Sequence, residues 1–238
     1  MVTPKSPFIA PHWPFDIRRL PFYYGWLIWV FSTLGILMSI PGQTMGMAVF
    51  TNHLIEALHL SRTQLSMAYL IGTVASSLLL TRAGRWYDQL GGRLTVALAS
   101  GGLATMILFI SVTDSLAISF GGSVVISFLL ITLGYFGVRF FGQGVLTSAS
   151  INVLLVWFEK RRGLMSSARG VFVSFGFSIA PLALAWLIST GGWHEALWTL
   201  AILCLVFAGL AVVFLRDNPE SCGVLVDGHT HEDQVPEA

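Results

Sequence analysis

Long apolar runs alternate with short polar segments along most of this 238-residue chain. A mainly apolar stretch of about twenty residues is long enough to span the hydrocarbon core of a bilayer as an α-helix. The pattern predicts such helices at about 23–50, 61–81, 94–112, 124–156, 164–187 and 195–215. We therefore expect an all-α polytopic membrane protein with six transmembrane helices in 22–215, an N-terminal tail at 1–21 and a second tail at 216–238.

One apolar stretch, 116–158, is long for a single span and short for two spans with a loop between them. The basic segment Glu159-Lys160-Arg161-Arg162 follows it directly. Two spans would place this segment outside the cell, whereas basic residues in short loops concentrate on the cytoplasmic side. We therefore predict one span, at about 124–156.

The distribution of charge then fixes the orientation of the chain. Of the thirteen lysines and arginines, all but Arg62 and Arg139 fall on the side that carries both tails. Arg62 falls on the opposite side and Arg139 inside an apolar run. The positive-inside rule therefore predicts that both termini are cytoplasmic, in an integral protein of the plasma (inner) membrane.

The composition supports a membrane protein. The chain is 55% hydrophobic and only 11% charged, with a mean hydropathy of +0.75, whereas a soluble domain has about 25% charged residues. A net charge of +1 provides no basic surface for nucleic acid. Cys204 and Cys222 give neither a disulfide framework nor a metal-ligand spacing. The expected partner is the lipid bilayer, with no nucleic acid, no metal and no cofactor.

Arg139 is the one arginine deep within an apolar run. Such a charge is costly in hydrocarbon, so it is expected to face the protein interior or water. Gln143, Thr147 and Ser150 follow at helical spacing and would share its face. Arg139 and Gln143 are therefore candidate solute-binding residues, although a purely structural role for Arg139 remains an alternative. A further arginine, Arg169, either snorkels to the cytoplasmic surface, which we favour, or points into the cavity.

The first apolar run is interrupted by Pro41-Gly42, and Gln43 and Thr44 follow the interruption. Polar groups at a broken membrane helix either line a cavity or satisfy the carbonyls that the break leaves free. Both interpretations remain open, and the first makes Gln43 and Thr44 candidate solute-binding residues.

Small residues recur at helical spacing on three of the predicted helices. Such faces let membrane helices pack closely. The three sets are Gly35, Ser39, Gly42 and Gly46; Ala68, Gly72 and Ser76; and Gly163, Ser167, Gly170, Ser174 and Ser178.

Between the first two helices, His53, Glu56 and His59 are expected in a solvated loop rather than at a metal site, because their spacing does not stack them on one helix face. Ser61 followed by Gln64 predicts a capping box at the start of the next helix. Thr113-Asp114-Ser115 and Gly191-Gly192-Trp193-His194 are expected to be turns, and Pro181 to kink the helix that contains it.

Three short segments carry a resemblance to a known family. The turn from Gly84 to Arg93 has glycine, three residues, aspartate (Asp88), two residues and glycine (Gly91), with Arg93 after one further glycine. It resembles the loop between helices 2 and 3 of the major facilitator superfamily, whose basic residue follows the second glycine directly. The segments 139–144 and 157–163 resemble the helix 4 signature and the helix 4–5 turn of the same superfamily. The segment 216–223 resembles the start of the central loop in its oxalate/formate antiporter and monocarboxylate porter branches.

The resemblance implies the N-terminal, six-helix half of a twelve-helix secondary carrier, with the solute site between two halves. Gly84, Asp88, Gly91 and Arg93 would form a conformational gating loop. The expected function is transport of a small solute, an organic anion or monocarboxylate, by alternating access, with a second six-helix half or a homodimer as partner. The alternative is a non-transporting membrane subunit or a truncated remnant. An enzyme is not expected, because no nucleophile or general base lies at membrane depth.

Overall fold

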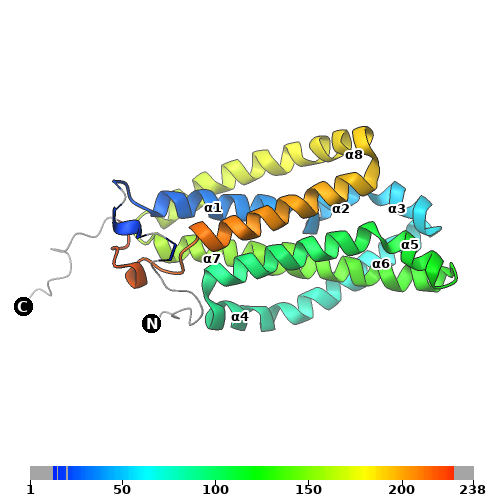
Figure 1. Ribbon diagram of the computed structural model, residues 1–238, viewed down its shortest axis with the longest axis horizontal. Helices are drawn as coiled ribbons and strands as arrows, with labels where there is room; N and C mark the ends of the chain where they lie inside the picture. The colour runs from blue at the N-terminus through cyan, green and yellow to red at the C-terminus, as the bar shows by residue number, and fades with distance from the viewer. Residues whose placement is uncertain (1–12, 15, 20, 228–238) are drawn as a thin grey trace, which may run out of the picture.

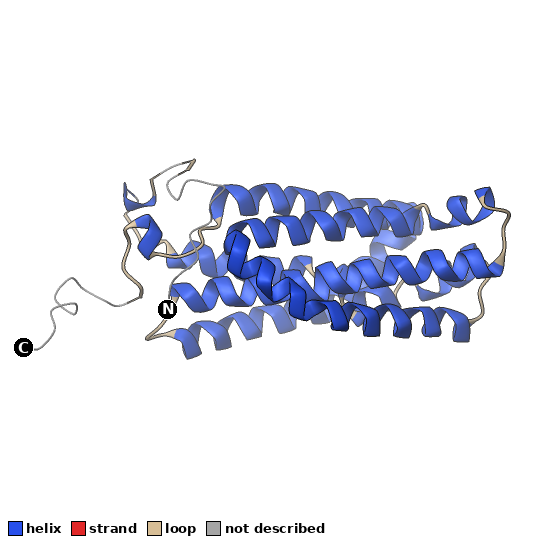
Figure 2. Cartoon of the chain, turned by 90° about the horizontal axis from the view of Figure 1, so that it is seen from below, coloured by secondary structure: helices blue, strands red, loops and turns tan. Residues whose placement is uncertain are grey.

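The computed structural model describes residues 13, 14, 16–19 and 21–227, and in these residues every regular element is helical. Figure 1 shows the long helices lying side by side in an elongated bundle. Figure 2, a view turned by 90°, shows that the loops gather at the two ends of this bundle. The bundle axis is therefore the direction in which apolar helices would cross a membrane.

The first apolar run forms several helical pieces. α1 (Gly25–Met38) is followed by the short 3-10 turn η2 (Ile40–Gly42), by α2 (Thr44–Ala48) and by α3 (Thr51–Leu58). Pro41 has no backbone N–H to donate and clashes with the preceding turn, which explains the predicted interruption. The expected loop at 53–59 is wrong, because His53 and Glu56 lie in α3 and His59 ends that helix in the left-handed conformation.

The second long helix, α4 (Arg62–Ser111), begins with the predicted capping box: Gln64 N–H donates to Ser61 Oγ (3.2 Å), and Ser61 N–H donates to Gln64 Oε1 (2.8 Å). Gly91 interrupts α4 with φ 81° and ψ 167°, a conformation open mainly to glycine. The predicted turn at 82–93 is therefore wrong in its extent, because the break in the helix is confined to Gly91. Its polar residues keep their helical hydrogen bonds, and the chain reverses at one residue (Figure 1).

The next segments correct one prediction and confirm another. Thr113–Ser119 forms the short helix α5 rather than a turn. α6 (Val124–Val138), the π-helix η3 (Arg139–Leu146) and α7 (Thr147–Trp157) run on as one apolar stretch of 34 residues. The prediction of one helix over 124–156 is confirmed.

The longest helix, α8 (Arg162–Phe214), has non-helical φ and ψ at Gly192, where φ is 81°. The expected outer turn at 191–194 thus also reduces to a single glycine. Pro181 is accommodated inside the helix, without the departure from helical φ and ψ that marks Gly192. Short 3-10 turns, η1 (Ile17–Arg19) and η4 (Glu220–Cys222), flank the bundle.

Four helical stretches in the described residues are long and apolar enough to cross a membrane: Gly25–Ala48, Arg62–Ser111, Val124–Trp157 and Arg162–Phe214. Two of them contain the reversals at Gly91 and Gly192, so each has two arms that lie alongside other helices (Figure 1). The chain is an all-helical integral membrane protein.

Hydrogen bonds at the proximal end of the bundle, where α1 begins and α8 ends, identify which segments meet there. Tyr24 OH donates to Phe214 O (2.7 Å), and Tyr23 OH donates to Trp157 O (2.6 Å). The reversal of α4 joins them, because Arg93 N–H donates to Asp217 Oδ1 (2.8 Å). The start of α1, the α4 reversal, the α7–α8 turn and the end of α8 are thus adjacent.

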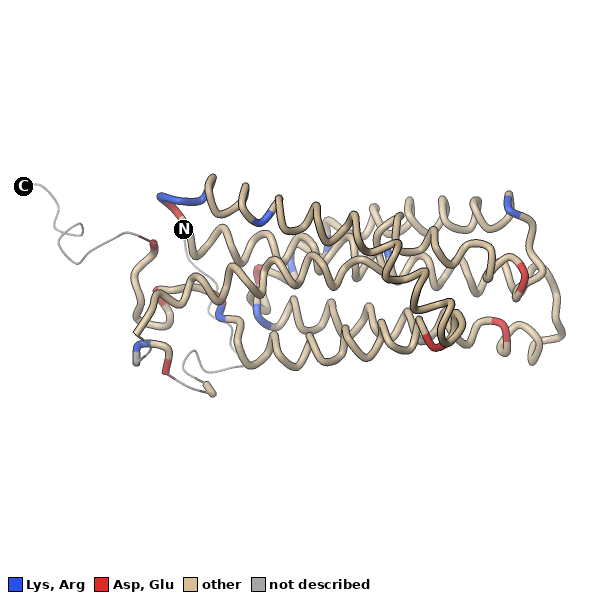
Figure 3. The backbone as a smooth tube through the Cα atoms, turned by 90° about the horizontal axis from the view of Figure 1, so that it is seen from above, with Lys and Arg blue, Asp and Glu red and all other residues tan. Residues whose placement is uncertain are grey.

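The distal end holds the remaining turns. His194, just after the α8 reversal, lies with Nε2 3.1 Å from Asp114 Oδ2 of α5, and Trp198 Nε1 donates to Ser111 Oγ (3.0 Å). Figure 3 shows the lysines and arginines mainly toward the proximal end and few charges along the middle of the bundle. This asymmetry is the one that the positive-inside rule uses.

Small residues let the central helices touch. A Cβ on Gly42 would lie 2.8 Å from the Cα of Gly142, and a Cβ on Gly72 would lie 2.7 Å from the backbone N of Phe136. The broken segment η2 therefore packs directly on the π-helix η3, and the first arm of α4 on α6. This packing positions the polar groups described next.

Candidate functional site

Arg139 lies where α6 passes into the π-helix, and it is half-buried inside the bundle. Its Nη1 donates to the carbonyl oxygen of Gly42 (3.1 Å), and its guanidinium carbon lies 5.3 Å from the centre of the Tyr69 ring. A helix break leaves carbonyls without intrahelical donors, and an arginine on an aromatic face gains a cation–π attraction. Two contacts thus hold the cation in place, and no acidic partner for it is found among the residues that the structure describes.

Gln43 and Thr147 connect the break to the π-helix. Gln43 Nε2 donates to Ser39 Oγ (3.0 Å) and, at a longer distance, to Thr147 Oγ1 (3.4 Å). Thr147 Oγ1 lies 3.1 Å from both Ser39 Oγ and Gly142 O. These contacts satisfy polar atoms at the break, and they also keep an amide and two hydroxyls next to Arg139.

Thr44 is exposed and accepts a hydrogen bond from Tyr69 OH (2.9 Å). A cavity of about 170 Å³ opens beside this pair and is lined in part by Thr51, Ser66 and Tyr135. The rings of Tyr69 and Tyr135 pack edge to face, 5.2 Å between centres. Hydroxyl groups thus line part of a small, otherwise apolar opening, and its lining residue Tyr69 also contacts Arg139.

Tyr69 and Tyr135 were not among the sequence candidates. A signal for Tyr69 existed, because it precedes Gly72 by three residues and Ser76 by seven, which places it with the small-residue face. A signal for Tyr135 existed too, because it precedes Arg139 by four residues and so shares its helix face.

Gln143 lies about one turn after Arg139 on the π-helix η3, and its side chain is exposed. Thr147 still reaches the site. Ser150 instead lies buried against α1, where its Oγ would contact a Cβ placed on Gly35.

The four residues of the expected gating loop separate into two pairs. Gly84 and Asp88 are exposed on the first arm of α4. Gly91 and Arg93 form a buried anchor at the reversal: Arg93 Nε donates to Val212 O (2.6 Å) and Nη2 to Trp13 O (3.0 Å). A Cβ on Gly91 would lie 2.6 Å from Asp217 Oδ1.

Asp217 and Asp227 are the acceptors that sequence reasoning missed at this end. Burial raises the pKa of the Asp217 carboxyl, and the backbone N–H groups of Arg93 and Gly92 and the charges of Arg93 and Arg216 offset part of that rise. Asp227 accepts the backbone N–H groups of Glu159, Lys160 (3.1 Å) and Arg161 (2.8 Å). The segment after α8 therefore ties the α4 reversal to the α7–α8 turn.

Arg169 does not snorkel to the surface. It is 8% exposed, and its Nη1 donates to Ser32 Oγ (3.2 Å). The preference for snorkelling was wrong because α8 packs its arginine face on α1, where a serine hydroxyl accepts the hydrogen bond.

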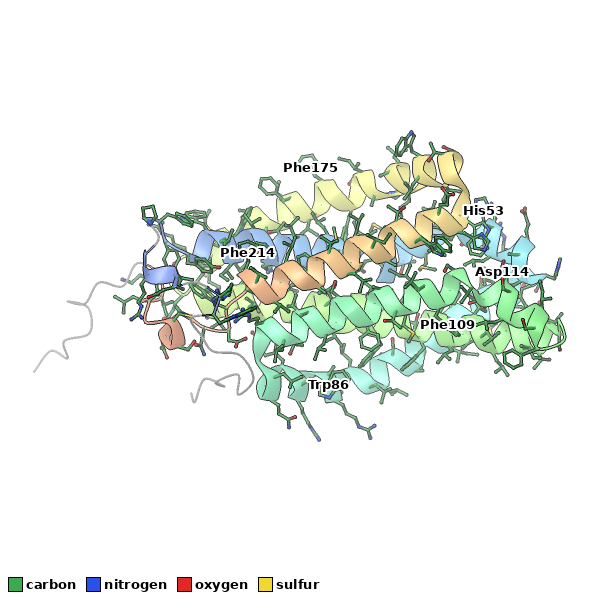
Figure 4. The ribbon with its side chains drawn as sticks, viewed as in Figure 1. His53, Trp86, Phe109, Asp114, Phe175 and Phe214 are labelled. Atoms are coloured by element: carbon green, nitrogen blue, oxygen red, sulfur yellow. The ribbon has the colours of Figure 1, made fainter. Side chains whose placement is uncertain are left out.

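Among the residues that the structure describes, no three His, Cys, Asp or Glu side chains come together to form a possible metal site. The acid and imidazole nearest one another, Asp114 and His194, meet at the distal end, away from Arg139. Figure 4 labels Asp114 in this region, with His53 of α3 nearby.

Comparison with known proteins identifies the family of this chain. The model of the Major Facilitator Superfamily matches residues 32–224. This match runs from α1 to just beyond η4 and contains all the polar groups around Arg139. Searches of curated proteins and of solved structures gave no match. The chain belongs to the Major Facilitator Superfamily.

Proposed function

We propose that this chain is one half of a secondary carrier that moves a small organic anion, such as a monocarboxylate, across the membrane by alternating access. Membership of the superfamily supports transport in general. The observation that carries the choice of an anion is Arg139, a half-buried cation whose guanidinium lies against Tyr69, a residue that lines a cavity partly bordered by hydroxyl groups.

Arg139 is arranged so that it can bind a carboxylate. A guanidinium has five N–H donors, and the described contacts engage one of them, with Gly42, while Tyr69 covers one face. A bidentate carboxylate pair would use two of the remaining donors. Thr44 and Tyr69 hydroxyls beside the cavity supply further hydrogen bonds. We assign Arg139, Gln43 and Thr44 to solute binding, with Tyr69 added, and place Gln143 at the rim, where its exposed amide would meet the solute.

The membrane topology that we propose has six crossings. The reversals at Gly91 and Gly192 divide α4 and α8 into two arms each, and the arms together with Gly25–Ala48 and Val124–Trp157 make the six. The proximal end, where most basic residues gather, is assigned to the cytoplasm, and the protein to the plasma membrane (Figure 3).

A second six-helix unit is proposed because α8 leaves a packing face uncovered. Gly163, Ser167, Gly170, Ser174 and Ser178 are all exposed, and a Cβ on Gly163 or Gly170 would meet no atom within 4 Å. The small-residue faces on α1 and α4, by contrast, are packed within the bundle. Figure 4 shows Phe175 on the outer side of α8, away from the other helices. A second half or a second copy of the chain would cover this face.

One observation favours the rival, a subunit that moves no solute. Arg139, Gln43 and Thr147 all have acceptors within the bundle, so they also serve to satisfy the helix break. A carrier moves solute across the membrane, whereas a non-transporting subunit does not, so a measurement of solute uptake distinguishes them. Proteoliposomes holding the chain with its proposed second half, or as a dimer, should take up labelled formate, oxalate or lactate faster than empty liposomes and should not take up a neutral sugar. No uptake of any small carboxylate would favour the rival.

A further inference from the structure

A cavity of about 290 Å³ lies between α1, η2 and the two arms of α8. Its lining is apolar throughout: leucine, isoleucine, alanine, methionine, proline and glycine, with Cys204 as the one exception. The Cys204 thiol is 3.6 Å from Met38 O, to which it donates. A water molecule needs two to four polar partners, and this lining offers none.

The cavity opens to the outside of the bundle. Ile179 and Leu203, on opposite arms of α8, form its rim and are 59% and 47% exposed. Ala180 and Leu184 at its base are 7% and 5% exposed. Because both arms belong to an apolar membrane-crossing stretch, the surroundings of the opening are the hydrocarbon of the bilayer rather than water.

The size of the cavity selects the occupant. An α-helix with its side chains is about 10–12 Å across, too wide for a space of about 290 Å³. A single flexible aliphatic chain fits such a space, and an apolar void left empty forfeits the contacts of its lining atoms. We propose that this cavity binds one acyl chain of a bilayer phospholipid.

The bound chain would reach the candidate solute site through one residue. Pro41 lines the cavity, and the carbonyl of its neighbour Gly42 accepts the hydrogen bond of Arg139. η2 itself is held by the bonds from Gly42 N–H to Ser39 O (2.8 Å) and from Gln43 N–H to Ile40 O (2.9 Å). An acyl chain packed against Pro41 therefore supports η2 on the side opposite Arg139. The turn η2 in turn positions Arg139 through the carbonyl of Gly42.

The direct test is photo-crosslinking of the full chain in nanodiscs with a phospholipid that carries a diazirine near the end of one acyl chain. Adducts are mapped by mass spectrometry. We expect Met38 and Cys204, which line the cavity, to be labelled more strongly than Ile202, which is 59% exposed on the same arm of α8 as Cys204 but does not line the cavity. Labelling at Met38 and Cys204 no stronger than at Ile202 would overturn the proposal.

A matched pair of variants provides the control. Ala183 lines the cavity, whereas Ala185, two residues away and also exposed, does not. Ala183→Leu should fill the space and abolish the Met38 and Cys204 adducts, and Ala185→Leu should leave them unchanged. Unlabelled phospholipid should compete with the probe, and free oleate at equal chain concentration should not. Equal competition by oleate would contradict a phospholipid as the occupant.

A separate measurement tests whether the bound acyl chain supports η2. Hydrogen exchange of the Gly42 and Gln43 amides should slow when phospholipid is added to delipidated chain in detergent. This slowing should be lost in Ala183→Leu and kept in Ala185→Leu. Exchange that does not respond to lipid in the unmodified chain would show that the cavity does not support the break.

Discussion

Asp217 accepts the backbone N–H of Arg93 at 2.8 Å and so ties the end of α8 to the glycine reversal of α4. Gly91 has φ 81°, and a Cβ there would lie 2.6 Å from the Asp217 carboxylate. Two features therefore require glycine at this position: the positive φ of the backbone and the lack of room for a Cβ.

The first prediction compares two glycines of the same turn. Gly91→Ala should lower the unfolding temperature, because an extended conformation with positive φ costs a non-glycine residue roughly 1–3 kcal/mol before the clash with Asp217. Gly84→Ala should be neutral or raise stability by about 0.5–1 kcal/mol, since Gly84 is helical with open space around it. Thermal unfolding in detergent measures both variants. Equal effects would contradict the anchor at Gly91.

The second prediction concerns pH. Because burial raises the pKa of Asp217 above its unfolded value, its contribution to stability is fully present below the unfolded pKa, near 3.9, and is lost as the pH rises through the folded pKa. Asp217→Asn keeps an oxygen acceptor for Arg93 and should flatten the stability profile in that window. A wild-type profile already flat there would rule out the effect.

Asp88 carries a separate prediction about transport. It is exposed in the last turn of the first arm of α4, where the helix dipole disfavours a carboxylate by about 0.3–1 kcal/mol unless a positive group of the proposed second half offsets this cost. An energy of this size shifts a conformational equilibrium modestly. Asp88→Asn should therefore slow solute uptake in the assembled carrier without changing membrane insertion. Unchanged uptake at equal expression would make Asp88 a solvated residue with no gating role.

Topology gives the fourth prediction. In a chain with Cys204 and Cys222 replaced by serine, single cysteines at Gly121 and Thr190, both exposed at distal turns, should react with an impermeant maleimide on intact cells. Cysteines at Gln89 and Gly163, exposed at the proximal end, should react only after the membrane is opened. Labelling of Gly163→Cys from outside would reverse the proposed orientation.

Several parts of this architecture follow from sequence for definite physical reasons. The basic segment 159–162 decided that 124–156 is one helix, and Pro41 located the break in the first run. The helix break brings together Arg139, Gln43 and Thr44, because polar groups in the hydrocarbon region must find hydrogen-bond partners within the protein.

Other parts depend on information that periodicity does not contain. The π-helix at 139–146 is one such feature, because no residue pattern in the sequence indicated it. The polar run at 82–90 stayed helical because a single glycine was enough for reversal. Arg93 and Asp217 are 124 residues apart in sequence, so only the fold reveals that Arg93 is an anchor.

The oligomeric state follows from the uncovered face of α8. Polar groups exposed to hydrocarbon cost several kcal/mol each, roughly, so association should be favoured over a lone bundle. In proteoliposomes whose copy number is counted by single-molecule bleaching, we expect carboxylate flux from dimers or from the chain with a complementary half. Gly170→Leu should weaken this association, whereas Gly209→Leu, exposed on the other arm of α8, should not. Flux from vesicles with one copy would contradict the half-carrier proposal.

The most direct test of the central claim, an anion site at Arg139, measures binding and stability on the same samples of the assembled carrier. Equilibrium binding of labelled carboxylates and the unfolding temperature are compared for the unmodified chain, Arg139→Ala and Arg85→Ala, the last at an exposed arginine of α4. The account predicts that Arg139→Ala abolishes binding and lowers the unfolding temperature only by the loss of its contacts with Gly42 and Tyr69, and that Arg85→Ala changes neither. Binding that persists in Arg139→Ala while the unfolding temperature falls would show that Arg139 holds the helix break and not the solute.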